Sequence, residues 1–435
     1  MKKRLRAAAT SLLLILIVAL GLRLLFLADY VAQNSPHALG ILPFLFESGN
    51  IAVSLATGHG FSSPLRVPTG PTAWMTPVYP LLLAGIFRIF GVYKFASFLV
   101  AALLNVLFAT LACVPLYYTA KRIGGVGVAA GATWLWAIFP NAILLTFESM
   151  WGGCLTALLA VTVLWATLAL DGSRRLRDWC GYGLLLGLLL MTNPTVSSVL
   201  PFLLGWLIYR DWRQRRPAPI RHSAMRPALA LGIAILCCVP WTVRNYEVFH
   251  TLVPLRSVLG LQLWLGNNPR AKPIWLASLH PINNQAQRAE YIRMGEIAYM
   301  NRKFREAIRY MVTHPGRVAY LAWRRFLGLW AGGTPYPVRS FFANHSIWFR
   351  YVLLFNLMAG IGAAVGLVIL FWRRDPYTIP VAAYPLIFPW AYYLTLEMPR
   401  YRLPIDPVVM LLLAVTFGAL FHLMKGGRRR KPHPG

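Results

Sequence analysis

Acidic residues are scarce in this chain of 435 residues, which has 13 Asp and Glu against 43 Lys and Arg. Charged residues make up 13% of the sequence, and 57% of it is hydrophobic. Ordinary globular proteins carry roughly 25% charged residues, which cover their surface in water. The shortage of charge therefore excludes a set of soluble domains and indicates that much of the surface faces lipid.

Motifs for disulfides and metal sites are also missing from the sequence. None of the five cysteines belongs to a CxxC motif or to a Cys/His ligand spacing. They lie in or beside apolar stretches, as small core residues do. We therefore predict no disulfide framework, no metal site and no cofactor, while a need for a divalent metal stays open. The cysteines are Cys113, Cys154, Cys180, Cys237 and Cys238.

The excess of positive charge has two interpretations. A basic protein can bind nucleic acid, but here the Lys and Arg residues flank apolar runs. Short cytoplasmic loops of membrane proteins carry this bias. We therefore expect membrane lipids as partners and no nucleic acid.

Apolar runs long enough to cross a bilayer, about 20 residues, recur along the chain. The first follows MKKRLR and continues past Arg23, which favours an uncleaved first span over a signal peptide. Asn193 and Pro194 break one run into two short segments. The predicted spans, about ten, lie near 7–28, 96–120, 125–146, 149–170, 179–193, 195–209, 227–243, 348–372, 377–396 and 404–424.

The positions of the basic residues predict the orientation. With the N-terminus inside, the inner loops are rich in Lys and Arg, and the short outer connections at 141–148 and 397–403 carry only Arg400 and Arg402. Both termini are then cytoplasmic, in the inner membrane of a bacterium.

This orientation divides the chain into three predicted parts. They are a transmembrane core over 1–243 with the outer loop 29–95, an outer (periplasmic) helical segment over 244–347, and transmembrane helices with a basic cytoplasmic tail over 348–435.

The outer segment 244–347 is predicted to be folded. Apolar residues recur at a helical period between Gln285 and Thr313, where Arg302 and Glu306 have i,i+4 spacing. The basic, aromatic stretch HPGRVAYLAWRRFLGLW that follows is typical of a helix lying along the outer membrane surface.

With so few acids, the candidates for chemistry can be named one by one. Glu47 begins a short amphipathic helix with Ile51, Ala52 and Leu55 on one side. Such a carboxylate can also simply complement the helix dipole. Asp29 and Glu148 lie at the predicted outer edge of the membrane, where an ionisable residue is a functional hypothesis, although Glu148 could equally pair with an arginine.

Arginines at the outer edge need a partner, because they oppose the charge bias of the loops. Arg400 and Arg402 flank Tyr401 between two prolines, and Arg244 lies where a span ends. Arginine suits bidentate contact with phosphate. The alternative is an anchor at headgroup depth, with Tyr401 in the interfacial belt. Arg256 is a weaker candidate, and His280 is interpreted as an ordinary polar loop residue.

Several motifs follow one another in a characteristic order. Glu47 precedes an "xIAxxLA" helix and then PVYPLLLAGIFRIFG, FES lies at 147–149, PWTVRNYEVF begins at Pro240, and MPRYRLPIDP spans 398–407. This order resembles the GT-C superfamily of membrane glycosyltransferases, closest to its aminoarabinose-transferase, protein O-mannosyltransferase and RgtA/B/C/D-like branch. Relatives often have an Asp-Glu pair where this chain has Phe46 and Glu47.

The resemblance implies an all-α, polytopic bundle of GT-C type with folded helical outer loops. It also implies inverting transfer of a hexosyl or pentosyl group from a polyprenyl-phosphate donor to a glycan, lipid or protein acceptor on the outer face. Glu47 or Asp29 would be the base and Glu148 a supporting carboxylate. Arg400, Arg402, Arg244 and Tyr401 would bind the donor phosphate.

Two alternatives stay open. A lipid or glycan flippase or transporter would place ionisable residues near the middle of the membrane, whereas here they lie at its edges. A membrane scaffold without catalysis would need no particular residue at these positions.

Overall fold

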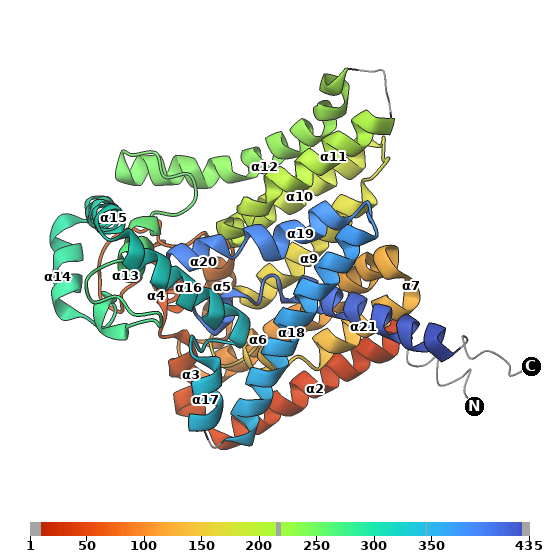
Figure 1. Cartoon of the computed structure of the whole chain (residues 1–435). Helices are drawn as coiled ribbons and strands as arrows, with labels where there is room; N and C mark the ends of the chain where they lie inside the picture. The colour runs from red at the N-terminus through yellow and green to blue at the C-terminus, as the bar shows by residue number, and fades with distance from the viewer. Residues whose placement is uncertain (1–9, 215–218, 345, 429–435) are drawn as a thin grey trace, which may run out of the picture.

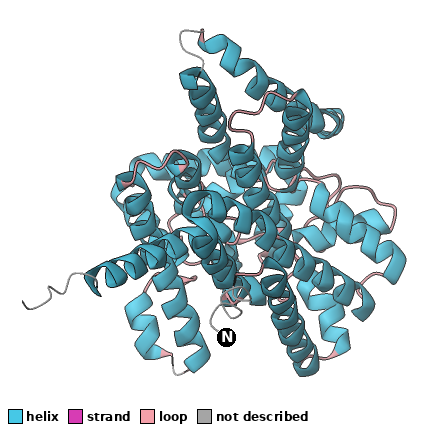
Figure 2. Ribbon diagram, turned by 90° about the vertical axis from the view of Figure 1, so that its right-hand side faces the viewer, coloured by secondary structure: helices cyan, strands magenta, loops and turns pink. Residues whose placement is uncertain are grey.

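The computed structural model describes residues 10–214, 219–344 and 346–428, and this part of the chain is helical with no strand (Figure 1). The predicted all-α class is confirmed. A second view shows the same packed bundle of helices joined by loops (Figure 2). The basic residues 1–6 and the end of the basic tail, 429–435, were both predicted to be cytoplasmic and lie outside the described residues.

The helices follow one another with short connections, apart from the outer loops. The first half contains α2 (Leu12–Gln33), α3 (Pro36–Ile41), η1 (Leu42–Phe44), α4 (Glu47–Ala56), α5 (Val78–Phe90), α6 (Phe95–Leu111), α7 (Cys113–Ala137), α8 (Pro140–Leu144), α9 (Gly153–Ala169), α10 (Leu176–Thr192), η2 (Pro194–Val199), α11 (Leu200–Gln214) and α12 (Ile220–Phe249). The second half contains α13 (Leu259–Gly266), η3 (Ala277–Leu279), α14 (Gln285–Met294), α15 (Glu296–Thr313), α16 (Pro315–Ala331), α17 (Pro337–Ala343), α18 (Ile347–Trp372), α19 (Thr378–Ile387), α20 (Trp390–Leu394), η4 (Pro399–Tyr401) and α21 (Asp406–Arg428).

Five helical stretches of the described chain are long and apolar enough to cross a membrane, or six if the bent unit of α3, η1 and α4 is one span. They are α2, the α6–α7 stretch, α12, α18 and α21. The chain is therefore a multi-pass membrane protein, but the count of about ten spans is not confirmed. One reason is that α6 and α7 run on almost without a loop, and α7 is interrupted at Gly125, which has a positive φ of 73°.

The predicted break at Asn193 and Pro194 is confirmed. α10 ends at Thr192, the side chain of Asn193 accepts a hydrogen bond from the amide of Thr195, and η2 begins at Pro194. The predicted span 377–396 is also divided. α19 ends at Ile387, and α20 begins at Trp390, directly after Pro389. Proline lacks the N–H that a continuous helix needs.

α2 carries a charged residue, Arg23, inside the bundle. Its side chain is fully buried, and its Nη atoms donate to the carbonyls of Ala19, Trp136 and Ala137 at 3.0–3.2 Å. Trp136 and Ala137 end α7, where carbonyls lack partners within the helix and the helix dipole is negative. Arg23 is thus a cap on α7 that joins it to α2.

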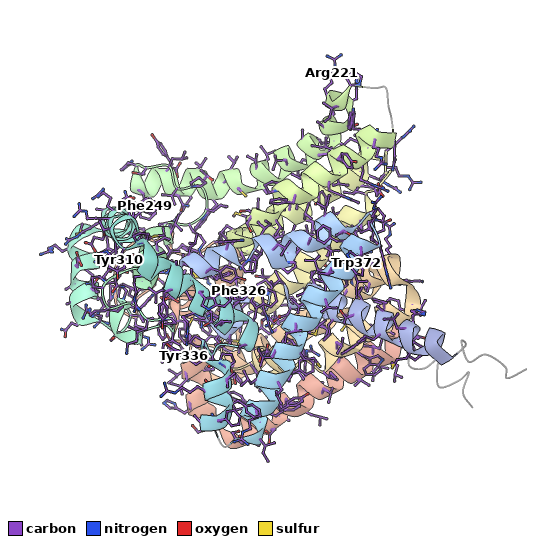
Figure 3. All side chains as sticks on the ribbon, viewed as in Figure 1. Arg221, Phe249, Tyr310, Phe326, Tyr336 and Trp372 are labelled. Carbon is purple, nitrogen blue, oxygen red and sulfur yellow. The ribbon has the colours of Figure 1, made fainter. Side chains whose placement is uncertain are left out.

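Segments predicted on opposite sides of the membrane lie at opposite ends of the molecule. In Figure 3, Phe249 and Tyr310 lie at the left, while Arg221 and Trp372 lie toward the right. The outer helices α13, α14 and α15 gather at the left end in Figure 1, and α21 points away from them.

The predicted outer segment, residues 244–347, contains helices α13 to α17. The run from Gln285 to Thr313 is two helices, because Gly295 separates α14 from α15 with a positive φ of 76°. The Arg302–Glu306 pair is confirmed at 2.8 Å. The apolar residues Phe304 and Ile308 are exposed, whereas Lys303 is buried on the other face of α15.

Candidate active site

Glu47 begins α4 and is buried, with its side chain 9% exposed. α4 turns by 102° from the preceding α3–η1 unit, and Gly49 permits this turn, since a Cβ there would lie 2.0 Å from the Phe44 carbonyl oxygen. The loop after α4 folds back on it through a hydrogen bond from Asn50 to the Pro64 carbonyl, at 2.8 Å. The loop after α4 is thus attached to the first turn of the helix that begins with Glu47.

His280 contacts Glu47 from the outer segment. Its Nε2 lies 3.4 Å from Oε1 of Glu47, which is longer than a well-formed hydrogen bond. The imidazole packs edge-on against Trp74 and Trp275, with ring centroids 5.9 and 6.2 Å apart. Burial lowers the pKa of His280 against an opposing effect of Glu47, so the ring is neutral near pH 7.

Two arginines approach the same place. Arg256 donates from Nε to the Trp74 carbonyl at 3.1 Å. Burial lowers the pKa of Arg256, and the negative charge of Glu47 is among the groups that raise it. Arg400 also acts on the pKa of His280, lowering it. His280 contacts Glu47, Arg256 binds the carbonyl of Trp74, whose ring packs on His280, and Arg400 lies over the ring of Phe46, the residue before Glu47. We call Glu47, His280, Arg256 and Arg400 the Glu47 cluster.

The guanidinium of Arg400 lies against aromatic rings. It lies 4.0 Å from the ring centroid of Trp151 and 5.9 Å from that of Phe46, the residue before Glu47. Its buried Nε has no hydrogen-bond partner among the described residues. Tyr401 is next to it and stacks on Tyr392 at 4.6 Å. An arginine held by ring faces with a free donor is suited to an anion from outside the chain.

The structure places Arg400 and the adjacent Tyr401 on the side of Phe46, the residue before Glu47, and leaves two acids outside. Asp29 is exposed near the end of α2, and its carboxylate accepts a hydrogen bond from Gln33 at 2.8 Å. Glu148 is exposed in the loop between α8 and α9. Neither contacts a member of the Glu47 cluster among the described residues.

Arg402 has a different place from Arg400. It is 1% exposed and donates from Nε to Asp406 at 2.6 Å, from Nη1 to the carbonyls of Leu329 and Trp330 at 3.1 Å, and from Nη2 to Asn356. These bonds occupy four of its five N–H groups and join it to the end of α16. Because Arg402 is buried and paired with Asp406, we leave it out of the proposed phosphate site.

Arg244 also has partners within the chain. Its guanidinium donates to the carbonyls of Thr72 and Phe61 at 2.7 and 2.8 Å and lies over the ring of Trp241 at 5.1 Å. It attaches the first outer loop to the end of α12. We therefore interpret Arg244 as a structural residue rather than a phosphate ligand.

Glu296 joins the outer loop to α15. Its buried carboxylate accepts from the hydroxyls of Thr72, Ser257 and Tyr291 at 2.5–2.7 Å and from the amide of Ala73 at 2.8 Å. Trp74 follows Ala73 in the chain, and Arg256 precedes Ser257. Glu296 thus holds in place two segments that form the Glu47 cluster.

Glu397 is a buried acid whose pKa makes the stability of the protein depend on pH. It is 3% exposed between α20 and η4, and its Oε1 has no hydrogen-bond partner among the described residues. Burial raises its pKa from 4.5 to about 7, against the effects of Arg402 and Arg325. A folded pKa above the unfolded one means that the folded state binds the proton more tightly, so this contribution to stability is complete below about pH 4.5 and is lost as the pH rises through 7.

We expect Glu397→Gln to remove this contribution to the pH dependence. As the pH rises from 5 to 8, the free energy of unfolding of the wild type should fall relative to that of the variant. The full fall is about 1.4 kcal/mol for each unit by which folding raises the pKa of Glu397. Melting temperatures of both proteins in detergent between pH 5 and 8 would measure it. Equal slopes for the two proteins would contradict a raised pKa.

Among the described residues, no group of three or more His, Cys, Asp or Glu side chains could hold a metal ion. The Glu47 cluster itself contains one carboxylate and one imidazole, whereas a metal held by protein side chains usually has at least three such ligands.

Comparison with known proteins gives a family match over part of the chain. Residues 72–243 match the family of dolichyl-phosphate-mannose-protein mannosyltransferases. This region runs from the first outer loop to α12, and Glu47 precedes it. No curated protein matches the chain in sequence.

Solved structures of an archaeal oligosaccharyltransferase share the fold. The archaeal oligosaccharyltransferase AglB from Archaeoglobus fulgidus, in complex with an inhibitory peptide and a dolichol-phosphate, aligns with a TM-score of 0.54 at 14% identity, over 98% of this chain and 52% of that chain. Its complex with Zn and sulfate also gives 0.54, at 13% identity over 95% and 50%. ArnT from Cupriavidus metallidurans, bound to undecaprenyl phosphate, gives 0.36 at 15% identity over 90% and 76%.

This chain spans about half the length of the oligosaccharyltransferase that it matches. The fold is that of GT-C membrane proteins, and with the family match it confirms the resemblance to the GT-C superfamily of membrane glycosyltransferases.

Proposed function

We propose that this protein is an inverting glycosyltransferase that moves a sugar from a polyprenyl-phosphate donor to an acceptor hydroxyl, on the outer face of the inner membrane of a bacterium. The observation that supports this most is the Glu47 cluster, where the buried Glu47 contacts His280 and Arg400 lies over the ring of the preceding Phe46, with an Nε that has no hydrogen-bond partner among the described residues. The family match over residues 72–243 supports a lipid-phosphate donor.

In the proposed reaction, Glu47 is the general base. The acceptor oxygen attacks the anomeric carbon while its proton passes to the carboxylate, a step typically worth about 10²–10⁴-fold in rate. The bond from the anomeric carbon to the phosphate oxygen breaks, and its electron pair leaves with the polyprenyl phosphate. The same carboxylate stabilises the positive charge that develops on the sugar.

Arg400 is the proposed ligand of the donor phosphate, with Arg256 as the second cation. Negative charge grows on the phosphate as it leaves, and a fixed guanidinium stabilises that charge. The Trp151 ring holds Arg400 from one side, so the ligand would approach from another. Tyr401, stacked on Tyr392, would form part of the wall beside the phosphate.

A panel of donors tests the proposal. Purified protein in detergent would be incubated with polyprenyl phosphates carrying hexoses or pentoses, with a solubilised envelope fraction as the source of acceptors. We expect the wild type to consume at least one donor. Arg400→Gln should lower kcat/KM for that donor by about 10–100-fold, the effect of losing one hydrogen bond to a charged group.

Arg339→Gln is the matched control, because Arg339 is an exposed arginine on α17. It should behave as the wild type. Consumption of no donor in the panel would refute the transferase and favour a protein that moves lipids without glycosyl transfer. Equal kcat/KM for Arg400→Gln and wild type would remove Arg400 from the site.

A further inference from the structure

The backbone around His280 holds its imidazole in one place. The amide of His280 donates to the Ala277 carbonyl, and its own carbonyl accepts from the amides of Asn283 and Asn284 at 2.9 Å. Trp74 and Trp275 pack against the ring. The side chain is 5% exposed, so the ring has little room to turn.

The hydrogen bond at Nδ1 decides where the proton of the ring lies. Nδ1 accepts from the amide of Ile282 at 3.2 Å, so it carries no proton. Burial keeps the ring neutral. A neutral imidazole has one N–H, which is therefore at Nε2, the atom that faces Oε1 of Glu47 at 3.4 Å.

This tautomer can donate to Glu47 but cannot accept a proton from it. Nε2 already carries its hydrogen, and the lone pair of Nδ1 is directed at the Ile282 amide. A relay in which His280 takes the acceptor proton from Glu47 would need an Nε2 without a hydrogen. The ring can act only on the position of the carboxylate.

We propose that His280 is a positioning residue that holds Oε1 of Glu47, leaving Oε2 to take the proton of the acceptor. This inference rests on the proposed function. Hydrogen bonds that serve catalysis are often long without substrate and shorten in the complex, and a small movement would turn the 3.4 Å contact into one.

A neutral donor is suited to this task because of the charges nearby. Arg256 and Arg400, from the loop after α12 and from η4, are the cations of the cluster. A direct ion pair with either would favour the charged carboxylate and weaken it as a base. A hydrogen bond from neutral His280 would hold the Glu47 carboxylate without placing a further positive charge beside it.

The test compares two substitutions. Glutamine can place an amide N–H near the position of Nε2 and does not titrate, whereas leucine fills space without a donor. We expect His280→Leu to lower kcat by about 10–100-fold, the range for a displaced catalytic group, with KM for the donor within twofold of wild type. His280→Gln should recover kcat to within about fivefold, with the acid limb of the pH profile unchanged.

Two further measurements separate this role from others. In a Glu47→Gln background, His280→Leu should cause no further loss, because it acts through Glu47. A cryo-EM structure of His280→Leu should show the Glu47 side chain turned toward Arg256 or Arg400. Melting temperatures of all variants should stay close to that of wild type.

Several outcomes would overturn the inference. They are a wild-type kcat for His280→Leu, a loss of kcat in His280→Gln as large as in His280→Leu, and a Glu47 side chain that keeps its place in the leucine variant. The last is independent of activity. A wild type that transfers no sugar would instead refute the proposed function, while the cryo-EM comparison would still decide the role of His280.

Discussion

Replacing Glu47 by glutamine is expected to lower the rate of sugar transfer by about 10²–10⁴-fold, the usual contribution of a general base. Glutamine keeps the size of the side chain and can still contact His280, but it cannot accept the acceptor proton. Because Arg400 is unchanged, KM for the donor should change little. The measurement is kcat and KM for the donor that the wild type consumes, at a fixed acceptor concentration.

Asp29→Asn and Glu148→Gln are the matched controls for this prediction. All three changes remove one carboxylate, but Asp29 and Glu148 are exposed and lie outside the Glu47 cluster. We expect both to retain nearly the rate of wild type. If Asp29→Asn were inactive and Glu47→Gln active, Asp29 would be the base and the Glu47 cluster would not be the active site.

The fold was predictable because it depends on features that are local in the sequence. Apolar length, breaks at residues such as Asn193 and Pro194, and the helical period after Glu47 can all be read within a window of about 20 residues. The count of spans was less predictable. Whether two apolar runs form one bent helix, as around Gly125, depends on packing with other segments.

Buried arginines explain why only part of the site could be predicted. Arg23 donates to carbonyls at the end of α7, Arg402 to those of Leu329 and Trp330 near the end of α16, and Arg325 to those at the ends of α13 and α20. Unpaired carbonyls at a helix end attract a cation, as a phosphate does. Arg400 and Arg402 are two residues apart, and only the tertiary structure shows which one is a cap.

His280 and Arg256 were underestimated for a related reason. Each lies in an irregular loop of the outer segment, more than 200 residues after Glu47 in the chain. No spacing rule connects residues so far apart. The nearest signal was the local sequence, because Arg256 in LVPLRSVL and His280 in IWLASLHPI are each the one ionisable side chain in a short, mostly apolar stretch.

Glu296→Ala is expected to be the most destabilising of the proposed substitutions, at about 3–5 kcal/mol, because four buried donors lose one acceptor and each unsatisfied buried group costs about 1–3 kcal/mol. The change would leave the hydroxyls of Thr72, Ser257 and Tyr291 and the amide of Ala73 without their acceptor. Thermal unfolding in detergent, followed by tryptophan fluorescence, would show a lower melting temperature.

Glu247→Ala provides the comparison, because Glu247 is an exposed acid near the end of α12 and surface changes usually fall within about 0.5 kcal/mol. Where Glu296→Ala still folds, its activity should also fall, since Trp74 and Arg256 are the chain neighbours of the residues that Glu296 binds. Glu296→Gln retains an acceptor oxygen and should recover part of both losses. A Glu296→Ala protein as stable as Glu247→Ala would show that the outer loop is held by other contacts, and the rigid support proposed for the Glu47 cluster would have to come from Arg244 instead.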